Sequence, residues 1–232
     1  MNGLEYTKRV FRTFNRVSDG AHGNTRGFHG SLTAFSLQKV LDAVDVYGRN
    51  FMDIGFGTGV VLAAALTSGA SKAHGFELPE NQANQHIFHA AMRRISNELL
   101  IIPNFSRRAL VEFKDIVQVW LGNASLCTNC LYTVITLFLK WQVNSLPEGT
   151  EVIFTFWNGM ELQTQIHILE LCSSSQSLDS LVVFRDQDWR RPADILRQLE
   201  EFGDSSWSLH RTIKTSMHGS GERKTAWVFF RD

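Results

Sequence analysis

The sequence predicts a three-layer α/β domain whose mostly parallel sheet ends in an antiparallel hairpin. Short β-rich apolar runs alternate with segments of helical periodicity along the chain, an order typical of βαβ units. Near the C-terminus, two β-rich runs flank Gly219-Ser220-Gly221, a turn that predicts the hairpin. An apolar content of 44% over 232 residues is enough for a sizeable core, so we expect one domain.

The first segment, Leu4–Val17, predicts an amphipathic helix with an apolar face and a basic remainder. Its basic residues are Lys8, Arg9, Arg12 and Arg16. Such a helix either covers a substrate entrance or packs on the domain edge, and both interpretations stay open. Ser18–Gly30 is rich in Gly, Asn, Ser and His without periodicity, which predicts a loop and a candidate lid. We therefore separate residues 1–30, the N-terminal helix and loop, from a main domain over residues 31–232.

The elements that follow are predicted from apolar periodicity, β-rich composition and turn signals. A helix over Leu37–Val44, capped by Thr33 or Ser36, precedes a first strand at Asn50–Ile54. The remaining predictions are, in order, a helix at Val60–Leu66, a second strand at Lys72–Glu77, a helix starting at Leu78–Asn81, a third strand at Ala109–Phe113, a fourth at Tyr132–Phe138, a fifth at Glu151–Trp157, a helix that follows Asn158-Gly159 and runs through Cys172, a strand at Leu181–Phe184, a helix at Pro192–Phe202 and hairpin strands at Ser206–Ile213 and Thr225–Phe230.

Composition excludes a strong global electrostatic field. Lys plus Arg and Asp plus Glu each number 23, so any binding to nucleic acid or to an anionic membrane must be local. The most apolar run, Cys130–Phe138, is too short to cross a bilayer, and the N-terminus lacks the order of a signal peptide, so we expect an intracellular protein, nuclear or cytoplasmic. Three cysteines argue against a disulfide framework, and Cys127 and Cys130 lack further zinc ligands, so we expect no metal site.

The sequence Asp53-Ile54-Gly55-Phe56-Gly57-Thr58-Gly59 occupies the turn between the first strand and the next helix. Glycine adopts positive φ at low cost, and its missing Cβ lets a ligand approach the amides at a helix N-terminus. The helix dipole favours a carboxylate or a phosphate there. The second strand ends in Glu77, whose carboxylate can accept hydrogen bonds from both hydroxyls of a ribose.

The glycine spacing favours S-adenosylmethionine over a dinucleotide. A dinucleotide fingerprint is Gly-x-Gly-x-x-Gly, whereas here Gly55, Gly57 and Gly59 alternate and Asp53 comes two residues before the first. An acid at the strand tip would repel a pyrophosphate but would tolerate an ammonium and a sulfonium. An ordinary tight turn and a nicotinamide-dependent oxidoreductase are the alternative interpretations of this motif.

Residues Phe51–Leu66, followed by Gly75-Phe76-Glu77, resemble the class I, seven-stranded S-adenosylmethionine-dependent methyltransferases. The resemblance runs from about Gly30 to the C-terminal hairpin and implies a Rossmann-like methyltransferase sheet. Within that superfamily, the same residues most resemble the non-SET histone lysine methyltransferases of the disruptor-of-telomeric-silencing (Dot) family. The chain departs from the Dot pattern at two places, which are His29-Gly30-Ser31 and Thr136–Trp141. It also lacks the motif of enzymes that methylate exocyclic amines of DNA bases.

The resemblance implies a set of cofactor-binding residues. The three glycines would approach the methionine part, and Asp53 would order the loop. Glu77 would bind the ribose hydroxyls, and Asp115 would accept a hydrogen bond from the adenine amino group. These cofactor-binding predictions comprise Asp53, Gly55, Gly57, Thr58, Gly59, Glu77 and Asp115.

The acceptor side is less defined. The candidates near it are Trp141, Trp157, Asn158 and His29, with Phe28, Phe138 and His22 as further neighbours. Each also has a plain structural explanation, as a packing aromatic or a loop residue. The leading hypothesis is methyl transfer to a protein, in particular to a lysine of a histone or nucleosome. The alternatives are an RNA or small-molecule acceptor and a non-catalytic module that keeps the fold.

Overall fold

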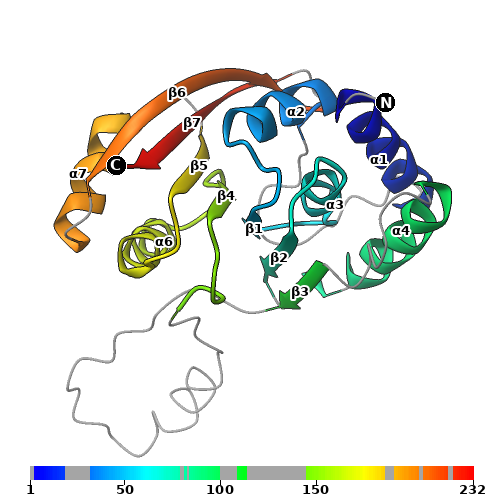
Figure 1. Ribbon diagram of the computed structural model, residues 1–232, viewed down its shortest axis with the longest axis horizontal. Helices are drawn as coiled ribbons and strands as arrows, with labels where there is room; N and C mark the ends of the chain where they lie inside the picture. The colour runs from blue at the N-terminus through cyan, green and yellow to red at the C-terminus, as the bar shows by residue number, and fades with distance from the viewer. Residues whose placement is uncertain are drawn as a thin grey trace, which may run out of the picture.

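The computed structural model is built around one seven-stranded sheet with helices on both faces (Figure 1). It describes residues 3–18, 32–78, 81–82, 84–99, 109–113, 145–185, 191–203, 206–218 and 222–232. The predicted three-layer α/β fold, with a mostly parallel sheet and a C-terminal antiparallel hairpin, is confirmed.

The helices and strands alternate along most of the chain. The strands are β1 Asn50–Ile54, β2 Lys72–Glu77, β3 Ala109–Phe113, β4 Val152–Phe156, β5 Ser180–Arg185, β6 Trp207–Ser216 and β7 Arg223–Arg231. The helices are α1 Gly3–Ser18, α2 Ala34–Ala43, α3 Val60–Thr67, α4 Asn84–Leu99, α6 Leu162–Ser174 and α7 Pro192–Phe202. The strand order is β3-β2-β1-β4-β5-β7-β6, in which β1 to β5 are parallel and β7 is antiparallel to both of its neighbours.

Two predicted elements need correction. Glu151–Trp157, predicted as the fifth strand, contains β4 and pairs with β1, so it is the fourth strand of the described sheet. The segment predicted as the fourth strand, residues 132–138, lies outside the described residues. The tip of strand four therefore follows Phe156. The difference from the Dot pattern noted at residues 136–141 does not lie at this tip. Helix α4 begins at Asn84, later than the predicted start at 78–81.

The two faces of the sheet bury separate apolar clusters, because successive residues of a strand point to opposite faces. Phe51 belongs to the cluster covered by α1, α2, α3 and α4, whereas Met52 and Ile54 belong to the cluster covered by α6 and α7. Figure 1 shows α6 and α7 at the left of the view, with α2 and α3 nearer its centre and α1 and α4 at the right. The order of the sheet thus separates the helices into two layers.

Helix α3 is the centre of the first layer. All eight of its residues are buried, as expected for a helix that is apolar all round. Helix α1 packs against α2, α3 and α4, and its Val10, Phe11 and Phe14 join the same cluster. The amphipathic helix predicted at the N-terminus is therefore confirmed, and it is part of the core. The division at residue 30 and the lid stay predictions, since residues 19–31 lie outside the described part of the chain.

Candidate functional site

The strand order reverses beside β1. From β1 the chain crosses to β2 and β3 on one side, and later to β4 and β5 on the other. In open α/β sheets, ligands bind outside the carboxyl ends of the strands at such a switch point. Here those ends are Ile54 of β1 and Phe156 of β4. We call the side on which β1 to β5 end the carboxyl edge and the opposite side the amino edge.

The turn from β1 into α3 has a backbone that glycine adopts most easily. Gly55, Gly57 and Gly59 have φ values of 83°, 56° and 87°. The Gly55 N–H donates to the carbonyl of Phe76 at 2.8 Å, and the Gly59 N–H donates to the carbonyl of Phe56 at 2.8 Å. The predicted strand-to-helix turn is confirmed, and β2 helps to hold it.

The three glycines differ in what surrounds them. A Cβ atom on Gly59 would meet the Phe88 ring at 2.2 Å, and one on Gly55 would approach the Met160 methyl at 3.3 Å. Among the described residues, a Cβ atom on Gly57 would have no neighbour within 4 Å. Gly59 is therefore required by packing, whereas Gly57 faces open space next to the first turn of α3. This is the place where a ligand can approach the backbone.

Glu77 is tied to the same turn. Its Oε2 accepts a hydrogen bond from the Gly57 N–H at 2.6 Å, while Oε1 accepts from the Leu78 N–H at 2.8 Å and from the Asn81 side-chain amide at 2.9 Å. A carboxylate has about four lone-pair sites, so one remains, on Oε2. A ribose that donated to both oxygens of Glu77 would have to replace one of the two donors at Oε1. Of these two, the Asn81 amide is on a side chain that can rotate, whereas the Leu78 N–H is fixed in the backbone.

Asp53 is a second buried carboxyl group in the same region, only 2% exposed on β1. Burial, and then the negative charge of Glu77, raise the pKa of Asp53 well above its ordinary value of 3.8. A cation bound nearby would stabilise the ionised form of Asp53 and so would counter both burial and the charge of Glu77. A pyrophosphate would add further negative charge to that of Glu77. The electrostatics of this edge therefore favour a ligand with an ammonium or sulfonium group.

The tip of β4 meets the glycine turn through Met160, whose methyl lies 3.3 Å from where a Cβ atom on Gly55 would be. The Met160 N–H donates to the Trp157 carbonyl at 3.1 Å, which closes a turn over Asn158. Trp157 is 2% exposed and belongs to the cluster under α6 and α7, so its indole is a core side chain. Asn158 is half-buried at the carboxyl edge.

The structure brings most of the described candidates together. The residues that gather around the turn are Asp53, Gly55, Gly57, Thr58, Gly59 and Glu77. Asp115, His29 and Trp141 lie outside the described residues, as do Phe28, Phe138, His22, Cys127 and Cys130. Sequence reasoning missed Asn81 and Met160. Asn81 lies four residues after Glu77, a spacing that could have suggested its contact, but nothing in the sequence pattern indicates Met160.

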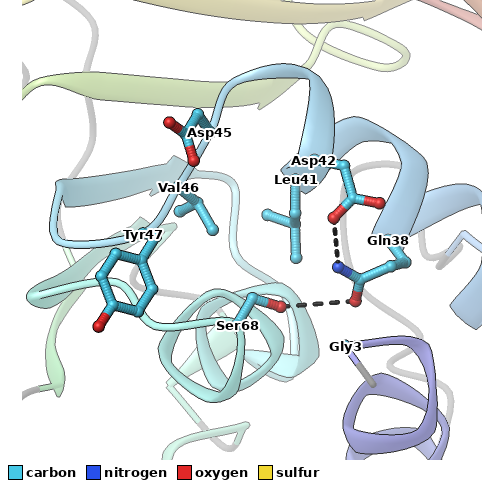
Figure 2. A pocket seen from close by; sticks show the side chains of 8 residues that line it. All are labelled: Gly3, Gln38, Leu41, Asp42, Asp45, Val46, Tyr47 and Ser68. Atoms are coloured by element: carbon cyan, nitrogen blue, oxygen red, sulfur yellow. Dashed lines mark hydrogen bonds between the residues drawn. The ribbon is translucent and has the colours of Figure 1, made fainter.

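A shallow pocket of about 220 Å³ lies at the amino edge, away from the glycine turn (Figure 2). Its lining includes Tyr47, Ser68 at the end of α3, and Gly3 at the start of α1. The Gln38 amide donates to Asp42 at 2.7 Å and accepts from Ser68 at 3.5 Å, so its central polar group is already engaged (Figure 2).

Three further features concern metal ions, membranes and the Cys172 thiol. Among the described residues, no group of three His, Cys, Asp or Glu side chains is placed to hold a metal ion. No helix in the described part of the chain is long and apolar enough to cross a membrane. Cys172 is a buried free thiol, and burial raises its pKa to about 12, so it is a structural residue.

Comparisons with known proteins identify the fold. No family model matches the chain, and no curated protein matches its sequence. The structure of PH1948 from Pyrococcus horikoshii, described provisionally as an RNA methyltransferase, matches with a TM-score of 0.57 and 14% identity over 96% of this chain and 98% of that one. The magnesium protoporphyrin IX methyltransferase ChlM from Synechocystis PCC 6803, with bound S-adenosylmethionine, matches with a TM-score of 0.54 and 14% identity. The match covers 100% of this chain and 98% of that one.

TrmN from Thermus thermophilus matches with a TM-score of 0.53 and 13% identity over 95% of this chain, which spans only 53% of TrmN. These likenesses show that the chain has the fold of class I S-adenosylmethionine-dependent methyltransferases. They give no support to the narrower resemblance to the Dot family.

Proposed function

We propose that this chain is an S-adenosylmethionine-dependent methyltransferase. The observation that carries the proposal is the open backbone at Gly57, flanked by the buried carboxyl groups of Glu77 and Asp53 at the switch point of the sheet. Open space admits the ligand and the two acids favour a cation, so the residues present fit this cofactor. The same surroundings oppose a dinucleotide.

Each part of the cofactor has a candidate partner. Gly55 and Gly57 would lie against the methionine part, whose carboxylate the N-terminus of α3 favours and whose ammonium Asp53 favours. Glu77 would accept hydrogen bonds from the ribose, with Asn81 yielding its position at Oε1. The role predicted for Asp115 at the adenine stays a prediction.

The chemistry asks little of the chain beyond position. When bound, the cofactor supplies a methyl group on a sulfonium that is already activated for in-line displacement. The chain needs no acid-base triad for this; it must hold the acceptor about 3 Å from the methyl carbon and exclude water. The glycine turn suits this task because α3 is buried on every side and Gly57 is hydrogen-bonded to Glu77, so the turn is held in place before any ligand arrives.

The acceptor is a separate question. The sequence resemblance extends the proposal to a protein lysine in a histone or nucleosome, and such a lysine must lose its proton before attack, which apolar surroundings favour. RNA or a small molecule is the alternative acceptor, in keeping with the RNA and porphyrin substrates for which two of the similar structures are named. A non-catalytic binding module is the remaining alternative.

The proposal is tested in two steps. Calorimetry with S-adenosylmethionine, with S-adenosylhomocysteine and with NAD should show binding of the first two only; binding of NAD alone would refute it. The protein is then incubated with methyl-labelled cofactor and separate pools of nucleosomes, free histones, RNA and small metabolites. Label in histones would support the lysine acceptor, label in RNA or metabolites would refute it, and binding without transfer to any pool would indicate the non-catalytic module.

A further inference from the structure

The neutral total charge of the chain conceals a separation of charge between its two helix layers. Helices α1 and α4 carry six Lys and Arg residues and two acids, whereas α6 and α7 carry four acids and one Arg. The six cations are Lys8, Arg9, Arg12, Arg16, Arg93 and Arg94, and all six are exposed. Helices α1 and α4 pack side by side, so these residues belong to one surface, which we call the basic face (Figure 1).

Most of the basic face has no counterion of its own. Lys8 pairs with Glu5, and Arg94 pairs with Glu98. Arg9, Arg12, Arg16 and Arg93 make no ion pair with the described residues. Within the described part of the chain, Arg9 and Arg12 interact with the charge of Glu5 only at a distance, so no direct contact there neutralises these four cations.

Three of these cations form a stripe along α1. Arg9, Arg12 and Arg16 are separated by three and four residues, a spacing that places them on one side of a helix. At 1.5 Å per residue the stripe is about 10 Å long. Because the apolar side of α1 is buried against α2, α3 and α4, the helix has no free apolar face to insert into a membrane.

The stripe leads toward the carboxyl edge. Helix α1 begins at Gly3, which shares the amino-edge pocket with Ser68 (Figure 2). Further along α1, the Phe11 ring lies 6.3 Å from the ring of His218, just after the end of β6. Strand β6 runs parallel to β5, because both are antiparallel to β7, so it ends at the carboxyl edge. Arg16, in the last turn of α1, is therefore the member of the stripe nearest the level of the glycine turn.

We propose that the basic face is a docking surface for single-stranded RNA, which it holds by the phosphate backbone so that a base can reach the carboxyl edge. The delivery of that base rests on the proposed function, but the docking does not. A row of guanidinium groups suits phosphates, and bases in single-stranded RNA are already unstacked, whereas those of duplex DNA must be flipped out at a cost. A basic histone tail would be repelled by the same charges.

The test uses the full chain and a fluorescent single-stranded RNA of about 20 nucleotides, longer than a typical single-domain site. The stripe variant is Arg9→Gln/Arg12→Gln/Arg16→Gln. The matched control, Lys72→Gln/Arg197→Gln/Arg211→Gln, removes three exposed cations on other surfaces. For three phosphate contacts on a single strand, the slope of log K against log salt should fall by about 2, and the Kd should rise about fifty-fold at 0.15 M salt. The control should stay within about threefold of the wild type, because exposed charges are screened at this salt.

Equal loss in both variants, no RNA binding by the wild type, or equal affinity for duplex DNA of the same sequence would overturn the proposal. Binding to vesicles of phosphatidylserine and phosphatidylcholine, or to an acidic peptide, in place of RNA would also overturn it. Circular dichroism melting should be unchanged in the stripe variant, since its side chains are exposed. Calorimetry with S-adenosylmethionine on the same samples separates the two ideas: RNA binding without cofactor binding refutes the proposed function alone, and the reverse refutes the docking surface alone.

Discussion

Replacement of Gly57 by alanine separates the ligand-binding role of the glycine turn from its effect on stability. The backbone of Gly57 has a φ of 56°, so an alanine there is held in the left-handed region at a cost of about 1 kcal/mol. For a chain of this length, that cost lowers Tm by about 2 to 4 °C. No atom in the described part of the chain lies within 4 Å of the new methyl group, so steric overlap with it adds nothing to the cost.

Gly48 is the matched control. It also has a positive φ, 76°, and a methyl group on its Cα would likewise have no neighbour within 4 Å. It lies in an exposed turn before β1, at the amino edge. Gly48→Ala should therefore lower Tm by a similar amount. The two substitutions differ only in which edge of the sheet receives the methyl group.

Only Gly57→Ala should weaken cofactor binding. The methyl group would occupy the space next to the turn and move the ligand away from Glu77. Loss of one hydrogen bond to a charged group costs about 1.5 to 3 kcal/mol, which corresponds to a rise in Kd of about 10- to 150-fold. Calorimetry with S-adenosylmethionine on the wild type and both variants measures this. If Gly57→Ala binds the cofactor as tightly as Gly48→Ala, the ligand does not approach this turn and the reasoning fails.

Three further predictions concern the buried acids. The folded state holds the Asp53 proton more tightly than the unfolded chain does, so ionisation of Asp53 lowers stability as pH rises above 3.8. Asp53→Asn should therefore raise Tm at pH 7 in thermal melts while weakening cofactor binding. A lower Tm would contradict the argument that burial destabilises the ionised form. In the wild type, a cationic ligand favours the ionised form, so calorimetry should show affinity increasing with pH until Asp53 is ionised, and a flat profile would exclude this coupling. Glu77→Gln should raise the Kd for the cofactor by about tenfold or more. Because the charge of Glu77 contributes to the raised pKa of Asp53, the substitution should also move the midpoint of the pH profile to lower pH. An unmoved midpoint would show that Glu77 does not influence the ionisation of Asp53.

Much of the fold could be predicted because its signals are local. Asn50–Ile54, Lys72–Glu77 and Ala109–Phe113 are short apolar runs bounded by turn signals, and the structure confirms all three as strands with the predicted bounds. Pro192–Phe202 is likewise confirmed, since proline favours the first turn of a helix. Strand order could not be read this way. Two apolar β-rich segments follow the third strand, and only the long-range pairing of β4 with β1 identifies the strand beside the glycine turn.

The site divides in the same manner. The glycines and Glu77 could be predicted because their roles depend on backbone conformation and on the ends of strands. The contacts of Asn81 and Met160 depend on how the chain returns to the glycine turn after β2 and after β4. The periodicity of the sequence does not predict these paths. Only part of the basic face could be predicted, because the sequence indicates that α1 is basic but does not show that α4 lies beside it.

The contact between Gly59 and the Phe88 ring has a consequence for how this sequence can change over time. A side chain at position 59 would displace an aromatic ring that is itself only 2% exposed, so neither residue can be enlarged or moved alone. Because the φ of 87° at Gly59 strains any side chain even where space is free, a smaller residue at 88 would not make a larger one at 59 acceptable, and glycine should persist at 59. In this way, a residue on α4 restricts which amino acids can stand in the loop that faces the ligand.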